Sequence, residues 1–415
     1  MHRLPLADEL PYRFHSPQVK PWLVRATKGF RTRMLRVDHR VEQVEIEGIE
    51  HLRPLLERGD GILLAPNHCD RADGLVLMEL ADRIDRPTCT MAAYQLFAGN
   101  AGLRHWLFPR LGIFPVDREG SDLSAVKAAV EVLVEGRHPL VVFPEGEVYH
   151  LADRITPLRE GVAFLAASAA KKAADTGRTV WIVPVGVKYR FLDDHDPLPA
   201  LSELMDRLEC RFTWFARRHV ALVKRINHYA AAMLALKEIE YWGEPKPGPL
   251  EERIAGLRSH ILGSMETRHL GNIRGDDVPS RIKGQRHHCL DRLGQEVTGE
   301  AERKALRHDL NDLFVAVQLF SYPGDYVREC PTVERAAEVL TKFEEDVLGP
   351  DILAPPRGPR RAIVKLGEPI DVGSRFQEGK KLRQIVSSLT TDLESRIQLL
   401  LNQIGPGRLL NVPRS

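Results

Sequence analysis

A histidine and an aspartate stand five positions apart, at His68 and Asp73, shortly after an apolar run over residues 61–65. On a regular helix this spacing points two side chains away from each other, so the pair can meet only where the chain turns. The apolar run predicts a buried strand that stops at Pro66, and residues 74–81 predict the helix that follows the turn. In that turn Asp73 can orient one ring nitrogen of His68 and leave the other to take a proton from a hydroxyl. The alternative is that Asp73 only caps the helix and that His68 is an incidental loop residue.

Three more segments each put a functional residue type at or within a predicted apolar strand. These segments are 112–118 with Arg118, 141–146 with Glu145 and Gly146, and 181–187 with Pro184. An arginine can bind a phosphate through paired N–H groups. A carboxylate at a strand end can accept a hydrogen bond from a glycerol hydroxyl, and a glycine beside it permits close approach of the backbone.

With these segments the chain resembles the glycerolipid acyltransferase family, whose best-known members make phosphatidic acid from lysophosphatidic acid. That family has four blocks in this order: N-H-x-x-x-x-D, G-x-x-F-x-x-R, F-P-E-G and a proline-bearing apolar strand. The first, third and fourth blocks occur here. The second is approximate, because Phe114 stands one place early and Pro115 takes the usual phenylalanine position. The resemblance covers about residues 40–190.

The resemblance implies an O-acyltransferase that moves a fatty acyl chain from acyl-CoA or acyl carrier protein to a lysophospholipid in phospholipid synthesis or remodelling. The expected acceptor is 1-acyl-glycerol-3-phosphate. The acyl donor is a co-substrate, and no metal or prosthetic cofactor is implied. By this resemblance the family's catalytic pair corresponds to His68 and Asp73. Its acceptor-binding residues correspond to Arg118, Glu145 and Gly146, and its acyl-pocket residue corresponds to Pro184.

Two features leave the acceptor headgroup open. After Gly146, well-studied family members continue with a small polar residue, Arg and Ser, whereas this chain continues with Glu, Val and Tyr. The missing arginine would help to bind a phosphate, and Arg154 or Arg159 is a candidate to replace it. Arg118 also has a structural alternative, which is a salt bridge with an acid at position 117, 119 or 122.

The predicted chemistry needs no nucleophile from the enzyme. A hydroxyl that attacks a thioester must lose its proton, and an imidazole of ordinary pKa, about 6.5, is largely neutral at cytosolic pH. Asp73 would hold the tautomer of His68 and stabilise the imidazolium, with the substrate's own oxygen as nucleophile. Backbone N–H groups at the start of the helix after Asp73, or at Glu145 and Gly146, would stabilise the oxyanion. Cys69 is the alternative, since a thiolate can carry the acyl group.

Composition limits the other possibilities. The 415 residues are 43% hydrophobic and 28% charged, enough to bury a substantial core, and the net charge of +2 argues against a globally basic nucleic-acid binder. The five cysteines include no C-x-x-C pair, which fits free thiols in a reducing cytosol. His287, His288 and Cys289 are metal-binding residue types, but the sequence shows no matching second pair of ligands, so we expect no metal there.

Two other functions compete with an acyltransferase. One is a metallohydrolase, although its possible ligands lack the two-on-one-helix-face spacing that such sites favour. Those possible ligands are His68, Asp70, Asp73, His105 and His150. The other is a non-catalytic lipid-binding protein of the same fold, which would bind lysolipid without releasing CoA.

The N-terminal segment, residues 1–40, predicts contact with a membrane surface. Between residues 13 and 40 eight lysines and arginines accompany one acid, and apolar residues recur at a helical period, namely Val19, Leu23, Phe30, Met34 and Val37. A basic helix with an apolar side suits the interface of an anionic bilayer. The alternative is that the apolar side packs on the core. Since no apolar run is long enough to span a bilayer, we expect a cytoplasmic protein that associates peripherally with the inner face of the membrane.

Strand and helix patterns alternate along the first half of the chain and predict an α/β fold, in which a layered sheet is flanked by helices. Charged helical patterns follow, and strand character returns near residues 362–370. We expect that late strand to complete the sheet that carries His68. The predicted parts are an acyltransferase domain of residues 41–192 plus 361–372, a mostly helical insertion over 193–360 and a C-terminal helix over 375–405.

Overall fold

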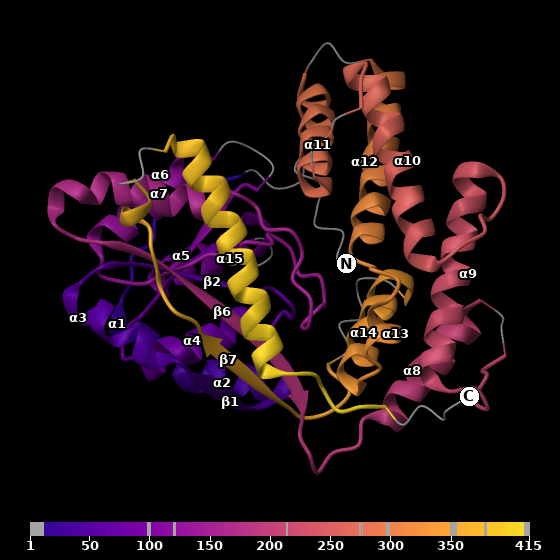
Figure 1. Cartoon of the computed structure of the whole chain (residues 1–415), viewed down its shortest axis with the longest axis horizontal. Coiled ribbons are helices and arrows are strands. Elements are labelled where there is room, and N and C mark those ends of the chain that lie inside the picture. The colour runs from indigo at the N-terminus through magenta and orange to yellow at the C-terminus, as the bar shows by residue number, and fades with distance from the viewer. Residues whose placement is uncertain are drawn as a thin grey trace. The chain divides into compact units, whose positions relative to one another are not determined.

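A computed structural model of the chain describes residues 12–97, 101–118, 122–212, 215–273, 275, 277–295, 299–348, 355–376 and 380–410. The first eleven residues of the expected basic segment therefore lie outside the described residues. The chain forms two compact units, which are Met1–Pro197 with Gly349–Gly407, and Leu198–Leu348 with Arg408–Ser415. Figure 1 shows that the first unit contains the sheet and that the second is helical.

The first unit is built on an eight-stranded, mostly parallel sheet. Its strands are β1 (Val41–Glu47), β2 (Gly61–Pro66), β3 (Cys89–Ala93), β4 (Ile113–Val116), β5 (Leu140–Val141), β6 (Val180–Phe191), β7 (Arg360–Leu366) and β8 (Ile370–Asp371). The order across the sheet is β1-β7-β6-β2-β5-β3-β4, with β8 paired to β6. β6 runs antiparallel to β7 and β8, whereas the other pairings are parallel.

β7 lies inside this sheet, between β1 and β6, although it comes from the C-terminal part of the chain. Phe191 at the end of β6 is the register partner of Arg360 at the start of β7. The N–H of Leu192 also donates to the carbonyl of Pro359 at 3.1 Å. The chain therefore leaves the sheet and returns to it at neighbouring points.

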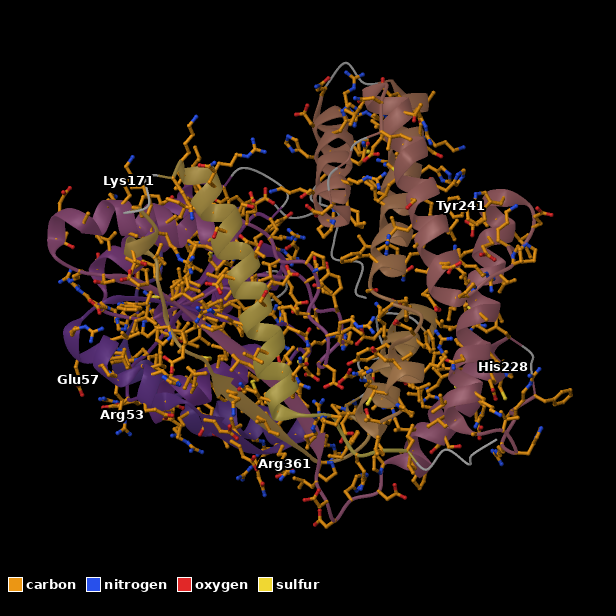
Figure 2. All side chains as sticks on the ribbon, in the orientation of Figure 1. Arg53, Glu57, Lys171, His228, Tyr241 and Arg361 are labelled. Carbon is orange, nitrogen blue, oxygen red and sulfur yellow. The ribbon has the colours of Figure 1, made fainter. Side chains whose placement is uncertain are left out.

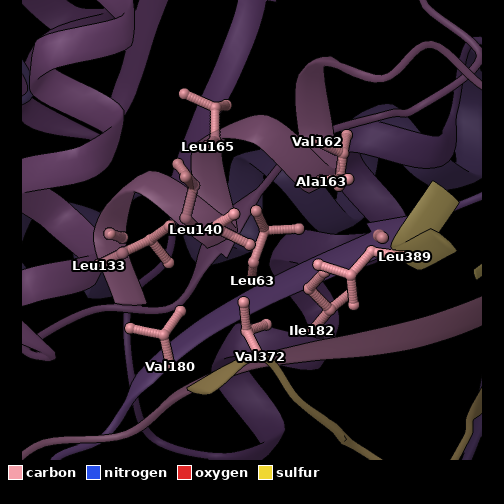
Figure 3. Packing of buried hydrophobic residues seen from close by; sticks show 14 of the residues in the cluster. Leu63, Leu133, Leu140, Val162, Ala163, Leu165, Val180, Ile182, Val372 and Leu389 are labelled. Carbon is pink, nitrogen blue, oxygen red and sulfur yellow. The ribbon is translucent and has the colours of Figure 1, made fainter. Parts of the chain in front are cut away.

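Side-chain alternation along β2 builds two hydrophobic cores, one on each face of the sheet. Leu63 and Ala65 belong to one core, and Ile62 and Leu64 belong to the other. The first core is completed by α6 (Leu123–Glu135), α7 (Gly161–Ala173) and α15 (Leu382–Ile404), and the second by α2 (Lys28–Val37), α3 (Arg53–Arg58) and α4 (Asp73–Arg83). Figure 3 shows part of the first core around Leu63. Charged side chains such as Arg53 lie on the outside (Figure 2).

The expected basic helix near the N-terminus is instead a pair of helices. α1 (Pro21–Ala26) and α2 are separated by Thr27, whose hydroxyl donates to the carbonyls of Leu23 and Val24. Such back-bonding bends helices. The apolar residues also divide between two roles, because Leu23 is buried while Phe30 is 65% exposed. The alternative that the apolar residues pack on the core thus holds for Leu23 and not for Phe30.

The regular elements described between β6 and β7 are helices joined by turns. The helices of the second unit are α8 (Leu198–Arg211), α9 (Leu222–Trp242), α10 (Leu250–Leu270), α11 (Val278–Gly294), α12 (Glu300–Phe320), α13 (Tyr326–Glu329) and α14 (Val333–Leu348). The predicted fold class, a layered α/β sheet with flanking helices and a C-terminal helix, is confirmed. Within the described ranges, no helix combines the length and the apolar character needed to cross a membrane.

Candidate active site

His68 and Asp73 meet at the carboxyl end of β2. β2 ends at Pro66 and α4 begins at Asp73, so the chain turns between the two residues as the spacing predicts. Nδ1 of His68 donates to Oδ2 of Asp73 across 2.8 Å. The His68 side chain is 20% exposed, whereas that of Asp73 is fully buried. Because the bond to Asp73 fixes a proton on Nδ1, Nε2 is the nitrogen that can accept a proton.

Asp73 accepts hydrogen bonds from several directions. Its Oδ2 also accepts from the backbone N–H groups of Cys69 at 2.9 Å and Asp70 at 3.0 Å. Its Oδ1 accepts from the hydroxyl of Tyr189 at 2.6 Å. A buried carboxylate with this many donors is held in one orientation. Asp73 therefore fixes the whole loop that carries His68, in addition to starting α4.

The residue before the histidine ties the loop to the sheet. Asn67 is fully buried. Its Nδ2 donates to the carbonyl of Val187 at 3.0 Å, and its Oδ1 accepts from the N–H of Val187 at 2.6 Å. This pair of bonds continues the β2–β6 ladder beyond the end of β2, so β6 sets the position from which His68 projects.

The Phe-Pro-Glu-Gly segment supports His68 from another side. The ring of Phe143 stacks on the ring of His68 with a centroid distance of 4.0 Å. Oε1 of Glu145 accepts from the N–H of His68 at 2.7 Å, and Oε2 accepts from the N–H and hydroxyl of Thr156 at 3.0 and 2.5 Å. Burial raises the pKa of Glu145 to about 7, although these hydrogen bonds act in the opposite direction. The contacts favour a positioning role for Glu145, and its predicted bond to an acceptor hydroxyl stays a prediction.

Two guanidinium groups lie against Gly146. Arg118 donates from Nη1 to the carbonyl of Gly146, and the same nitrogen lies 3.2 Å from a carboxylate oxygen of Glu147. The sequence did not suggest Glu147 as a salt-bridge partner. The φ of Gly146 is +77°, and a Cβ there would lie 2.6 Å from Nε of Arg159. Of the two arginines considered as replacements for the missing one, Arg159 is thus placed at Gly146. Its Nε is buried and has no hydrogen-bond partner among the described residues.

Pro184 is buried in the sheet interior. It is the register partner of Ala65 on β2, and its carbonyl accepts from the N–H of Gly367 at 2.9 Å. A Cβ on Gly367 would lie 3.0 Å from Cγ of Pro184, so the proline ring packs against the turn that follows β7. Its part in an acyl pocket remains a prediction.

Nothing in the sequence indicated a functional role for Arg360, the first residue of β7. Its Nη1 pairs with Oδ2 of Asp70 at 2.8 Å, its Nη2 donates to the carbonyl of His39 at 2.9 Å, and its guanidinium lies over the ring of Tyr189 at 4.6 Å. Burial by itself raises the pKa of Asp70, but the charge and hydrogen bond of Arg360 outweigh it and hold that pKa at about 2. Arg360 therefore fastens the loop of His68 to a strand from the far end of the chain.

The residues of the two alternative mechanisms have other partners. The thiol of Cys69 is buried and donates to the carbonyl of Val187 at 3.4 Å. Asp70 pairs with Arg360, and Nδ1 of His105 lies 2.7 Å from Nε2 of His15. These contacts do not favour an acyl-cysteine or a metallohydrolase site at His68.

Comparison with known protein families gives a match over the part of the chain that carries most of the sheet. A family model described as Acyltransferase matches residues 43–188, which include β2, the His68 loop, the Phe-Pro-Glu-Gly segment and most of β6. No curated protein matches the chain. Residues 43–188 therefore belong to the acyltransferase family, of the glycerolipid type that the motifs resemble, and the protein that carries them is an acyltransferase.

Proposed function

We propose that the protein transfers a fatty acyl chain from acyl-CoA or acyl carrier protein to the free hydroxyl of a lysophospholipid, with 1-acyl-glycerol-3-phosphate as the first candidate. The observation that carries the proposal is the 2.8 Å bond between His68 and Asp73, which directs Nε2 of a partly exposed imidazole away from its buried partner. Among the residues that the structure describes, Nε2 has no hydrogen-bond partner.

In the proposed reaction Nε2 of His68 removes the proton from the acceptor hydroxyl as its oxygen attacks the thioester carbonyl. The imidazolium, stabilised by Asp73, then returns the proton to the departing thiolate. The C–O ester bond forms and the C–S bond breaks, with no residue of the enzyme acylated. We assign the oxyanion to the backbone N–H of Gly74 at the start of α4, because the N–H groups of Asp73 and Leu75, like that of Gly146, already donate to backbone carbonyls.

We assign the acceptor's phosphate to the two guanidinium groups at Gly146. Arg118 donates to the carbonyl of Gly146, and the lack of a side chain on this glycine makes room for the guanidinium of Arg159. An arginine binds a phosphate through paired, charge-assisted hydrogen bonds. Arg159 would supply the charge that family members place two positions after this glycine.

The protein would meet its lipid at the inner face of the membrane through α1 and α2. Trp22, Phe30 and Val37 are 64%, 65% and 56% exposed on these helices. Basic residues of α2 line an open depression that Val37 shares, formed by Lys28, Gly29, Thr32, Arg33, Arg36 and Val37. Exposed aromatic residues beside basic ones suit an anionic interface.

The direct test is to incubate the purified protein with labelled acyl-CoA or acyl carrier protein and a panel of lysolipids, and to identify products by mass. We expect a diacyl product and release of the thiol carrier, with the phosphorylated acceptor preferred. Arg159→Gln should reduce that preference while sparing the Michaelis constant for the donor. Transfer to uncharged glycolipids alone would contradict the proposed acceptor.

A further inference from the structure

Three helices of the second unit bring a histidine, a cysteine and an aspartate together. His269 comes from the end of α10, Cys289 from α11 and Asp309 from α12. One ligand atom of each residue, the imidazole nitrogen, the sulfur and a carboxylate oxygen, lies within 4.8 Å of the other two. Cys289 and Asp309 are almost fully buried, and the His269 side chain is 13% exposed. The cluster belongs to no part of the acyl-transfer site.

We propose that these three side chains form a Zn²⁺ site. Thiolate, imidazole and carboxylate are the ligands that Zn²⁺ takes in proteins, at distances of about 2.0–2.3 Å. Side chains whose donor atoms lie within 4.8 Å can close on such an ion with small rotations. A soft thiolate also selects against Mg²⁺ and Ca²⁺, which prefer oxygen ligands alone.

Both oxygens of Asp309 now accept hydrogen bonds, and Oδ2 is the oxygen that an ion could bind. Oδ1 accepts from Nη1 of Arg268 at 2.5 Å, and Oδ2 accepts from Nε2 of His269 at 2.8 Å. The ion would replace the proton that Nε2 donates to Oδ2; the neutral imidazole would then carry its proton on Nδ1, and the bond from Arg268 would remain. Ligating carboxylates are commonly held by such an outer donor. Binding would also displace the proton of the Cys289 thiol to solvent.

The fold supplies what the sequence lacked. The run His287, His288 and Cys289 has no second pair of ligands close to it in the chain. In the fold α10 and α12 supply that pair, each from a residue twenty positions away from Cys289. The ring of His288 lies beside that of His269, with a centroid distance of 4.7 Å, but its nitrogens are not among the donor atoms that lie within 4.8 Å of one another. The fourth position of a tetrahedral site is therefore left to water.

Such an ion would join three helices that already share an apolar core and ion pairs such as that of Arg281 with Glu266. Cys289 lies in the same buried cluster as Leu293 of α11, Met265 of α10 and Leu306 of α12. A metal bound by all three helices stabilises the folded unit, because the ligands are assembled only when the helices are packed. The inferred role is structural and independent of acyl transfer.

The test uses the full chain without a polyhistidine tag, stripped of metal with a chelator and then titrated with Zn²⁺. We expect one zinc per chain by atomic emission and a higher melting temperature. Co²⁺ in place of zinc should show a thiolate charge-transfer absorption, which reports Cys289 directly. Cys289→Ser should abolish that absorption and weaken zinc binding by more than about tenfold.

Matched controls separate this site from other thiols and imidazoles. Cys210→Ser changes an exposed cysteine of α8, and His287→Gln changes the exposed neighbour of His288, so both should bind zinc like the unmodified chain. Asp309→Asn keeps the shape of the side chain and should also weaken binding. If the unmodified chain takes up no stoichiometric zinc, or if Cys289→Ser binds it equally well, the cluster is a buried ion-pair network and the proposal is wrong.

Discussion

The hydroxyl of Tyr189 donates a 2.6 Å hydrogen bond to Oδ1 of Asp73, the oxygen that His68 does not use. Tyr189 stands on β6, two residues after Val187, which holds Asn67. One strand therefore positions both ends of the loop, the asparagine before His68 and the aspartate that orients it. The guanidinium of Arg360 lies over the Tyr189 ring and extends this support to β7.

We expect Tyr189→Phe to lower kcat and to leave the Michaelis constants nearly unchanged. The change removes a hydrogen bond to a charged acceptor, worth about 1.5–3 kcal/mol. If that whole cost falls on the transition state, the rate drops roughly ten- to a hundredfold. Steady-state kinetics with both substrates would separate kcat from the Michaelis constants.

Tyr241→Phe is the matched control for this change. Tyr241 donates to Asp312 at 2.7 Å in the helical unit, so its loss removes the same kind of bond away from His68. We expect it to lower the melting temperature without changing kcat. Equal kcat for the two variants would show that Tyr189 has no part in positioning Asp73.

A second prediction concerns the proposed base. His68→Ala should reduce kcat by about two to four orders of magnitude, because it removes the group that takes the proton. Cys69→Ser should be nearly silent, since the thiol is buried and donates to the carbonyl of Val187. Rate assays and circular dichroism on both variants check this. Full activity in His68→Ala, or an acylated Cys69 trapped by mass spectrometry, would overturn the mechanism.

Much of the fold could be predicted from the sequence, because the strands and helices around His68 carry clear apolar periodicity. The alternation of Ile62, Leu63, Leu64 and Ala65 between two cores follows from a strand covered on both faces. The position of β7 inside the sheet could not be derived from periodicity, since strand order depends on long-range pairing. The break at Thr27 was missed because it rests on side-chain bonds within the helix.

Some contacts of the candidate active site could also be predicted from the sequence, and others could not. The contact between His68 and Asp73 was predicted because a short turn limits where five residues can go. Tyr189 and Arg360 were missed, because each reaches the loop from a distant strand and belongs to no motif. The role of Glu145 was also incomplete, since sequence spacing does not show that its two oxygens bind His68 and Thr156. Contacts of this kind have no local signal.

A third prediction is a pH dependence of stability that comes from Glu145. Burial raises its folded pKa to about 7 from an ordinary 4.5, so between these values the folded state binds more protons than the unfolded state. The contribution of Glu145 to the free energy of unfolding should therefore be largest below pH 4.5. It should be lost as the pH rises through 7. Denaturant melts of the protein and of Glu145→Gln across this range would measure the difference. An identical slope in both would rule out the raised pKa.

The membrane surface gives a fourth prediction. Deleting residues 1–40 would also remove Leu23 and Val24 from a core and Arg31 from its salt bridge with Asp82, so substitutions are the cleaner test. Trp22→Ser with Phe30→Ser should reduce sedimentation with anionic vesicles at low salt, and added salt should release the unmodified protein.

Phe164→Ser is the control for the vesicle experiment. Phe164 is 41% exposed on α7, so it tests whether any exposed phenylalanine contributes to binding. We expect this variant to sediment like the unmodified protein. Binding that ignores ionic strength, or that the Trp22 and Phe30 changes leave intact, would exclude α1 and α2 as the membrane contact.

The last prediction separates the sheet from the helical unit. Phe191 and Arg360 are register partners on β6 and β7, so a short hairpin linker between them can replace residues 192–359, which include the helices of the second unit. The C-terminal residues 408–410 should be removed as well, because the carbonyl of Arg408 accepts from Val333 and the N–H of Leu410 donates to Pro331. We expect the joined protein to melt cooperatively and to retain the His68 loop, since Arg360 and Tyr189 are both kept.

A fragment of residues 1–192 lacks β7, which leaves β1 unpaired and one edge of β6 open, so it should aggregate. Stable, cooperative melting of that fragment would instead mean that the first half of the chain folds without its C-terminal strand.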